Sequence, residues 1–228
     1  MPIENGSSHE KADQCLGAKT GGAWHGGMQM TAGRYRVSIC RLDRRARFEM
    51  AGPAHELFAA LQAAGLPLPP RVNSSAFAPS AVQVDWLGPR RVVVTAPMAD
   101  EASLHGLLLD VFGRLPCADM GCTTDMVSRF ELAGPGAADV LAQGTALDLS
   151  DQAFAPGSAT VTDLWGVAVV VERPLERQHC RCLTVDCSLA GFIQGWLQTA
   201  NGQPSGPRPG VMRTAGGAES VAAPGGVA

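Results

Sequence analysis

The stretch Glu131–Gly157, ELAGPGAADVLAQGTALDLSDQAFAPG, surrounds one short apolar run with glycine and proline. Its Gly134-Pro135-Gly136 could begin either a phosphate-binding loop or a helix. A dinucleotide-binding fingerprint requires G-x-G-x-x-G after a buried parallel strand, so that backbone amides can approach the pyrophosphate. Asp139 occupies the third glycine position here, and its carboxylate would repel a phosphate. The preceding segment MVSRFEL alternates polar and apolar residues, which is typical of a half-exposed antiparallel strand.

The glycines and the proline of this stretch fit the two ends of a short helix better than a nucleotide site. Gly134 precedes the helix, Pro135 takes its first position, and Gly144 is expected to end it in the left-handed conformation. The residues expected to face the core are Ala137, Val140 and Leu141. A Walker loop is excluded because the sequence contains no Gly-Lys-Ser or Gly-Lys-Thr.

N-terminal to this stretch, the apolar spacing predicts strands and helices in alternation. The expected elements are strands over 35–42 and 46–50, a helix over 53–65, a hairpin of strands 82–88 and 91–95, and a helix that Asp100 can cap. The helix after Asp100 has a stripe made of Leu104, Leu107, Leu108, Val111, Phe112 and Leu115. Such a stripe requires a sheet to cover it.

The second half repeats this order with different lengths. The expected elements are a strand over 126–132, the short helix, a hairpin over 159–172 that turns near Trp165-Gly166, a strand over 182–186, and a closing helix with Ser188 as N-cap. The closing helix has its own apolar stripe of Leu189, Phe192, Ile193, Trp196, Leu197 and Ala200.

The fold class expected from this order is α+β, with two small antiparallel-sheet units and packed helices. The first unit is expected over residues 32–117 and the second over 118–200. Residues 1–31 and 201–228 are rich in small and polar residues with little apolar pattern, and we expect them to be disordered.

Composition and charge argue against several classes of partner. The 228 residues are 46% hydrophobic and carry a formal net charge of -3, which gives no sustained attraction for nucleic acid or an anionic membrane. The arginine cluster 41–47 is interrupted by Asp43 and is interpreted as a solvated face or a protein contact. No apolar run is long enough to span a bilayer, and the N-terminus is polar, so we expect a cytoplasmic protein.

The seven cysteines invite a test for zinc. The soft ligands that could gather are Cys117, Cys122, Cys180, Cys182, Cys187 and His179. A C-x-C on a strand points both thiols to one face but lacks the turn of a C-x-x-C knuckle, and no second C-x-x-C closes a tetrahedral site. We therefore expect free, inert thiols and no metal site in this chain.

No catalytic constellation is recognisable. The sequence has no G-x-S-x-G elbow, and the histidines His9, His25, His55 and His105 stand in unrelated contexts. Two carboxylate pairs, Asp148 with Asp151 and Asp163 with Glu172, can be judged only in three dimensions. The expectation is a chain with no catalytic, cofactor-binding or metal-binding residue of its own.

From 34 to 200 the order of short signals resembles the γ subunit of heterotetrameric sarcosine oxidase. The residues that carry the resemblance are WLGP (Trp86–Pro89), LAGPGAADVLAQG (Leu132–Gly144), LDL (Leu147–Leu149), AFAPG (Ala153–Gly157), Thr162, Glu172-Arg173, LTV (Leu183–Val185), Ser188-Leu189-Ala190 and Trp196-Leu197. The chain departs from the family pattern where Arg90, Arg91 and Val92 follow WLGP, and where Thr145 stands in place of a cysteine. It also departs at 186–190, where an arginine of the family is absent.

The resemblance implies a fold similar to the folate-binding aminomethyltransferase fold. It also implies membership of a cytoplasmic oxidoreductase complex, with α, β and δ subunits as partners, that oxidatively demethylates sarcosine to glycine. Oxygen would be the acceptor and tetrahydrofolate would take the one-carbon unit. FAD, FMN, NAD and zinc would lie on the other subunits, and this chain would act in assembly. The alternative is a free-standing folate-binding one-carbon protein.

Two apolar features could contact a partner. The segment VAVVV, 167–171, is apolar on both faces, and Trp165 lies at an expected hairpin tip. Either a partner covers both features, or the segment is a central strand and Trp165 folds back onto its own sheet. Trp165 is the one interface residue that the sequence nominates.

Overall fold

The computed structural model describes residues 34–202, and the segments expected to be disordered lie almost wholly outside this range. Ten strands and four α-helices form within it. The strands are β1 (Ser38–Leu42), β2 (Ala46–Ala51), β3 (Ser74–Phe77), β4 (Gln83–Gly88), β5 (Arg91–Ala96), β6 (Asp119–Cys122), β7 (Val127–Ala133), β8 (Ala159–Leu164), β9 (Val167–Glu172) and β10 (Cys180–Asp186). The helices are α1 (Ala54–Ala63), α2 (Glu101–Phe112), α3 (Ala137–Ala142) and α4 (Ala190–Ala200).

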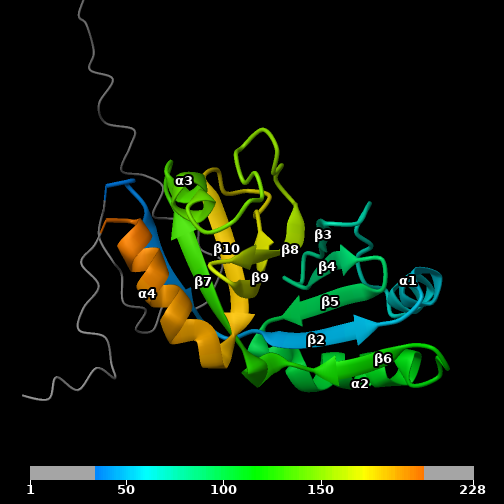
Figure 1. Cartoon of the computed structure of the whole chain (residues 1–228). Coiled ribbons are helices and arrows are strands. Elements are labelled where there is room, and N and C mark those ends of the chain that lie inside the picture. The colour runs from blue at the N-terminus through cyan, green and yellow to red at the C-terminus, as the bar shows by residue number, and fades with distance from the viewer. Residues whose placement is uncertain (1–33, 203–228) are drawn as a thin grey trace, which may run out of the picture.

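The strands make two five-stranded antiparallel sheets, which confirms the α+β fold class. Sheet I has the order β3-β4-β5-β2-β6, and sheet II has the order β1-β7-β10-β9-β8. In Figure 1 the two sheets lie side by side, with α1 and α2 beside sheet I and α3 and α4 beside sheet II.

One strand crosses the expected 117/118 boundary in each direction. β1, from the first half, pairs with β7 and places Ile39 opposite Leu132. β6, from the second half, pairs with β2 and places Met120 opposite Met50. Each exchanged strand thus adds an apolar side chain to the core of the sheet that it joins, so neither sheet is built from one half alone.

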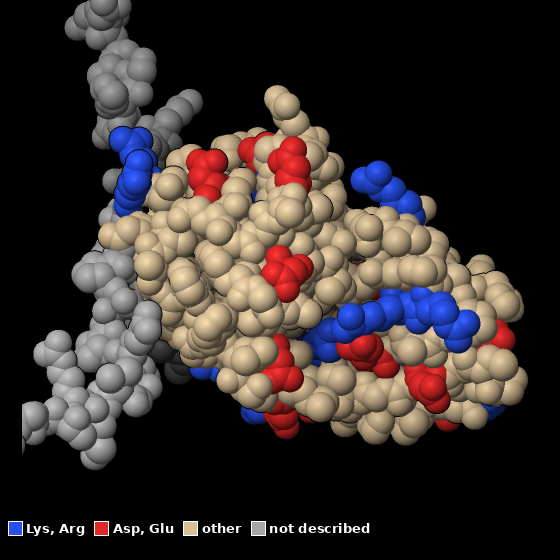
Figure 2. Space-filling model, viewed as in Figure 1, with Lys and Arg blue, Asp and Glu red and all other residues tan. Residues whose placement is uncertain are grey.

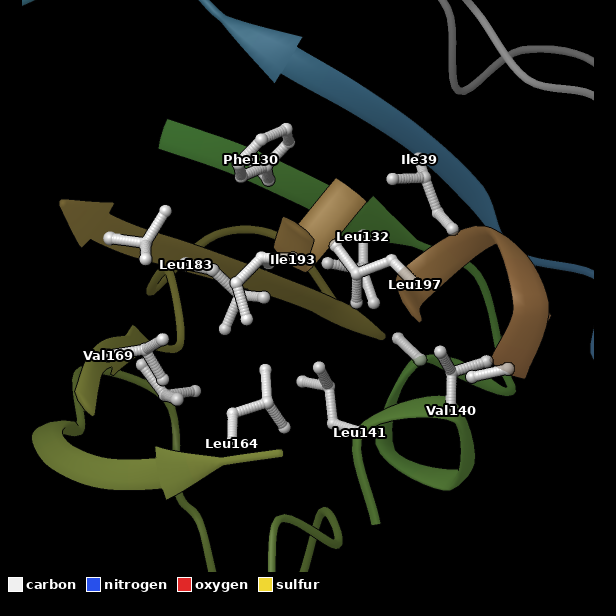
Figure 3. Packing of buried hydrophobic residues seen from close by; sticks show 14 of the residues in the cluster. Ile39, Phe130, Leu132, Val140, Leu141, Leu164, Val169, Leu183, Ile193 and Leu197 are labelled. Atoms are coloured by element: carbon white, nitrogen blue, oxygen red, sulfur yellow. The ribbon is translucent and has the colours of Figure 1, made fainter. Parts of the chain in front are cut away.

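The core of sheet II lies beneath α3 and α4. Phe130 and Leu132 of β7 and Leu183 of β10 point toward Ile193 and Leu197 of α4 (Figure 3). All five side chains are buried. Side chains alternate along a strand, so the same strands present Arg129, Glu131 and Cys182 on the opposite face.

The apolar segment 167–171 is covered by its own chain. It lies in β9, an inner strand between β10 and β8. Val169 and Val171 face the helices of sheet II, and Val170 packs with Val93 and Leu87 of sheet I. The four valines are buried within the chain and only Ala168 is exposed, so this segment needs no partner to cover it.

The two ends of α3 differ from their expected form. The helix begins at Ala137 with Gly136 as its N-cap residue, so Pro135 lies before the helix and not at its first position. Gly144 is absent from the described glycines with positive φ, and a Cβ on it would strike the ring of Trp165. Glycine at 144 is therefore required for close packing of an indole, not for a left-handed stop.

The two glycines at the start of this turn, Gly134 and Gly136, leave space for the backbone of residues 35–37. Gly134 has a φ of 138°, and a Cβ on it would strike the carbonyl oxygen of Arg36. A Cβ on Gly136 would strike the carbonyl oxygen of Tyr35. The Gly-Pro-Gly motif thus lets two backbone segments lie against each other.

Capping of the closing helix also differs from the expectation. Asp186, not Ser188, is the capping residue: its carboxylate accepts hydrogen bonds from the Ser188 N–H at 2.8 Å and from the Ser188 hydroxyl at 2.6 Å. This cap opens a 3₁₀ turn, Cys187–Leu189, that continues directly into α4.

Replacing Gly134 by alanine should lower the free energy of unfolding by about 2 kcal/mol or more, because the backbone at positive φ is strained for alanine and the Cβ meets a carbonyl. The matched control is Gly191→Ala on α4, where a Cβ meets no atom and the gain in helix propensity should stabilise the chain by about 0.5–1 kcal/mol. Urea unfolding of both variants measures the difference. Equal effects in the two variants would contradict this account of the turn.

Candidate functional site

The surface of α4 is unusual in having no charge. No charged residue occurs from Cys187 to Ala200. Three large apolar side chains of this segment are nonetheless exposed: Leu189 to 39%, Phe192 to 48% and Trp196 to 41%. In Figure 2 the surface over α4 is correspondingly free of blue and red side chains.

These three residues are one half of the apolar stripe expected from the sequence. Ile193, Leu197 and Ala200 face sheet II and are buried. Leu189, Phe192 and Trp196 follow one another at i, i+3 and i+7, which places them along one edge of the same stripe. The stripe is wider than the surface that sheet II offers, so this edge remains exposed to solvent.

Trp165 joins this edge from the β8–β9 turn. Its ring stacks on the ring of Trp196, with centroids 5.7 Å apart, and Phe192 meets Trp196 edge-on at 6.3 Å. Trp165 is half-buried and packs over Gly144 against the core of sheet II. It therefore folds back onto its own unit while supporting Trp196. We call Trp165, Leu189, Phe192 and Trp196 the aromatic patch.

A small pocket lies beside the Gly-Pro-Gly turn. It has a volume of about 190 Å³, and its lining includes Gly134, Ser150, Asp151, His179 and Arg181. This volume is below the roughly 300–1,000 Å³ that is usual for small-molecule sites.

Asp151 is the electrostatic centre of the pocket. Its carboxylate contacts Arg181 at 2.9 Å, Arg173 at 3.0 Å and the Nδ1 atom of His179 at 3.1 Å. The hydrogen bond from Arg181 is the main reason why the pKa of Asp151 lies below its usual range, and the charges of Arg173 and His179 add to it. A carboxylate held ionised by these partners is a counter-ion and a poor proton acceptor.

The carboxylate pairs considered from the sequence have other partners. Asp148 accepts the Ser150 N–H at 2.9 Å, and Asp163 accepts the Gly166 N–H at 2.9 Å in the β8–β9 turn. Glu172 lies 3.5 Å from Arg129, at the end of β9 far from that turn. The structure therefore assembles neither pair for acid–base chemistry.

The described histidines also have separate surroundings. His55 is exposed, with Nε2 4.0 Å from Glu56, and the ring of His105 stacks on Phe48 with centroids 5.5 Å apart. His9 and His25 lie outside the described residues.

Each arginine of the 41–47 cluster has a partner within the chain. Arg41 donates to Ser128, Arg44 pairs with Asp125, Arg45 donates to the Ala81 carbonyl, and Arg47 pairs with Glu49. The cluster thus links neighbouring segments of the fold and does not form a free basic patch.

The six described cysteines are free, and the sequence-nominated ligands divide into separate places. Cys117, Cys122 and Cys187 are exposed. Cys180 and Cys182 are buried together, with the carboxylate of Glu131 within 4.8 Å of both thiols. Glu131 was not predicted as part of this cluster because β10, the strand that brings the two thiols, is far from it in the sequence. The alternation in MVSRFEL did indicate that Glu131 lies on the polar face of its strand.

Charged side chains of both sheets also meet in the interior. Asp85 of β4 is buried and accepts hydrogen bonds from Ser75 at 2.5 Å and Gln83 at 2.8 Å. Burial raises the pKa of Asp85 to about 7, and repulsion from Glu172 of β9 contributes to the rise. Ionisation of Asp85 therefore opposes folding.

This raised pKa predicts the direction of a pH effect. The unfolded chain releases the Asp85 proton near pH 4 and the folded chain near pH 7, so stability should fall by about 2–3 kcal/mol as pH rises from 5 to 8. Asp85→Asn cannot ionise and should lack this fall, whereas Asp110→Asn, at an exposed position on α2, should retain it. Urea unfolding at both pH values tests this, and an unchanged fall in Asp85→Asn would exclude Asp85 as its source.

No protein-family model and no curated protein sequence matches this chain. Among solved structures, the fold is similar to a chain of heterotetrameric sarcosine oxidase from Corynebacterium sp. U-96, in complex with pyrrole 2-carboxylate. The TM-score is 0.67 and the sequence identity is 26%, and the match covers 75% of this chain and 86% of that chain. This chain resembles a sarcosine oxidase chain.

The fold is also similar to that of the glycine cleavage system aminomethyltransferase T from Bartonella henselae. The TM-score there is 0.53 at 14% identity, and the match covers 74% of this chain but 46% of the aminomethyltransferase. The resemblance to sarcosine oxidase and the similarity to the aminomethyltransferase fold, both expected from the sequence, are confirmed. Within residues 34–202, no helix has the length and hydropathy required to cross a bilayer.

Proposed function

We propose that this chain is the γ-type, non-catalytic subunit of a cytoplasmic heterotetrameric sarcosine oxidase. The complex would convert sarcosine to glycine by oxidative demethylation, with O₂ as acceptor and tetrahydrofolate taking the one-carbon unit. The observation that carries the proposal is the match with sarcosine oxidase, which extends over most of both chains. The match with the aminomethyltransferase extends over less than half of that enzyme.

The aromatic patch supports a role in assembly. The centre of a protein interface is depleted in charged residues and enriched in aromatic ones. α4 has this composition, and its exposed Phe192 and Trp196 stand on a helix that is anchored by Ile193 and Leu197. The ring of Trp196, already stacked on the half-buried ring of Trp165, loses little conformational entropy when a partner covers it.

The absence of a catalytic role is supported by how the polar groups are used. The carboxylate of Asp151 is held by Arg173, Arg181 and His179, and those of Asp148 and Asp163 accept backbone N–H groups in turns. The pocket at Asp151 is small for a flavin, NAD or folate. FAD, FMN and NAD would accordingly be carried by the α, β and δ subunits, and the resemblance assigns the zinc of the complex to those subunits as well.

One departure from the family pattern has an internal explanation. Arg91, which follows the WLGP segment, contacts Glu49 of β2 at 2.7 Å, and Glu49 also contacts Arg47 at 3.2 Å. Arg91 therefore links β5 to β2 within sheet I. Its presence does not require a contact surface for partner subunits that differs from the family's.

The proposal is tested by expressing the chain together with sarcosine oxidase α, β and δ subunits from the same organism and capturing it by an affinity tag. The expected result is co-purification of those subunits in a yellow assembly that consumes oxygen when sarcosine is added. Recovery of the chain without flavoprotein, from cells that produce the other subunits in soluble form, would reject it.

The aromatic patch should be required for that capture. Phe192→Glu places a charge in the patch and should reduce the captured large subunits at least tenfold, because the charge would have to be desolvated in the interface. Leu109→Glu is the matched control, since Leu109 is an exposed leucine of α2, away from the patch. Circular dichroism verifies that both variants fold, and equal capture by the two would show that the patch is not the interface.

The second candidate is a free-standing folate-binding one-carbon protein, which the aminomethyltransferase-like fold favours. Isothermal titration of the purified chain with tetrahydrofolate separates the two candidates. Saturable binding by the chain alone would favour this second function, and an assembly subunit should show none.

A further inference from the structure

The face of sheet II opposite α3 and α4 brings thiols and a carboxylate into one row. Glu131 of β7 stands opposite Cys40 of β1 on one side and Cys182 of β10 on the other. Residues directly opposite each other in antiparallel strands share a face of the sheet. Cys180, two residues before Cys182, points to that face as well.

Three of these groups converge closely enough to share one ion. A carboxylate oxygen of Glu131 and the sulfur atoms of Cys180 and Cys182 all lie within 4.8 Å of one another, and all three residues are buried. In a tetrahedral zinc site, Zn–S bonds of about 2.3 Å place two sulfur atoms about 3.8 Å apart. The upper limit of 4.8 Å in the cluster exceeds that spacing by only about 1 Å.

Arg177 holds the carboxylate of Glu131 in place and leaves lone pairs on both of its oxygen atoms free to bind a metal ion. The Nη2 atom of Arg177 donates to Oε1 of Glu131 at 2.9 Å, and its Nη1 atom donates to Oε2. Each carboxylate oxygen has two lone-pair positions, so each can accept one further bond. An outer partner that orients a ligating carboxylate is the usual arrangement around protein-bound metals.

The charges of the cluster suit a divalent cation. Two thiolates and one carboxylate exceed the charge of Zn²⁺ by one unit, and the paired guanidinium of Arg177 compensates for that excess. Sulfur donors in a buried site select zinc over magnesium or calcium, which prefer oxygen donors. Neither thiol forms a disulfide.

We propose that Glu131, Cys180 and Cys182 bind one zinc ion that joins β7 to β10. Binding releases the two thiol protons to solvent, and no oxidation or reduction accompanies it. This site belongs to the chain itself, and its test requires neither oxidase activity nor a partner subunit.

The experiment uses the full-length chain purified without chelator from zinc-supplemented medium, with metal content measured by mass spectrometry. The wild-type chain should contain about one equivalent of zinc and should show a thiolate-to-cobalt absorption band after exchange with Co²⁺. Cys182→Ser should weaken the band, because one of two thiolate ligands is lost, and should bind zinc at least tenfold more weakly. A wild-type chain with neither zinc nor the cobalt band would overturn the proposal.

Two further variants separate zinc binding from a general effect on folding. Glu131→Gln keeps the shape of the side chain and an acceptor for Arg177, so it should fold and yet bind zinc at least tenfold more weakly. Cys187→Ser removes an exposed thiol outside the cluster and should bind zinc like the wild type. Equal zinc affinity in Glu131→Gln and Cys187→Ser would exclude Glu131 as a ligand and reject the site.

Discussion

The alternation of side chains along β7 is the constraint on which the rest of the structure depends. Phe130 and Leu132 face the helices, whereas Arg129 and Glu131 point to the opposite face of sheet II. This strand therefore separates an apolar core from a polar face that carries charged side chains and thiols. β7 also pairs with β1 and β10, and its register fixes what stands beside each of these residues. A shift of the strand register by one residue would place Arg129 and Glu131 in the core and both apolar side chains on the polar face.

Local periodicity was sufficient for much of the fold. The spacing of apolar residues in α2 and α4, the alternation in β4 and the hairpin patterns of β4–β5 and β8–β9 placed these elements close to their actual bounds. β3 and β6 were missed because SSAF and DMGC are too short to show a period. The exchange of β1 and β6 between the sheets depends on pairing across the chain, which no local pattern records.

The sequence predicted an apolar contact surface near Trp165, but it did not predict which residues form that surface. The apolar stripe of α4 was visible in the sequence, but its width relative to sheet II was not, so Phe192 and Trp196 were taken for core residues. Trp165 was nominated as the interface residue, and it supports Trp196 from a half-buried position. Glu131 and the C-x-C thiols meet only through strand register, a relation between residues far apart in sequence.

The exchange of strands has a consequence for biosynthesis. Ser38 and its partner Ala133 are 95 residues apart, so β1 leaves the ribosome long before the strand that it pairs with. Until β7 follows, a nascent chain carries β1 with an open edge, and such edges invite pairing with other chains. The earliest strand to be synthesised thus waits for its partner while 95 further residues are added, and the growing chain is open to aggregation during that interval.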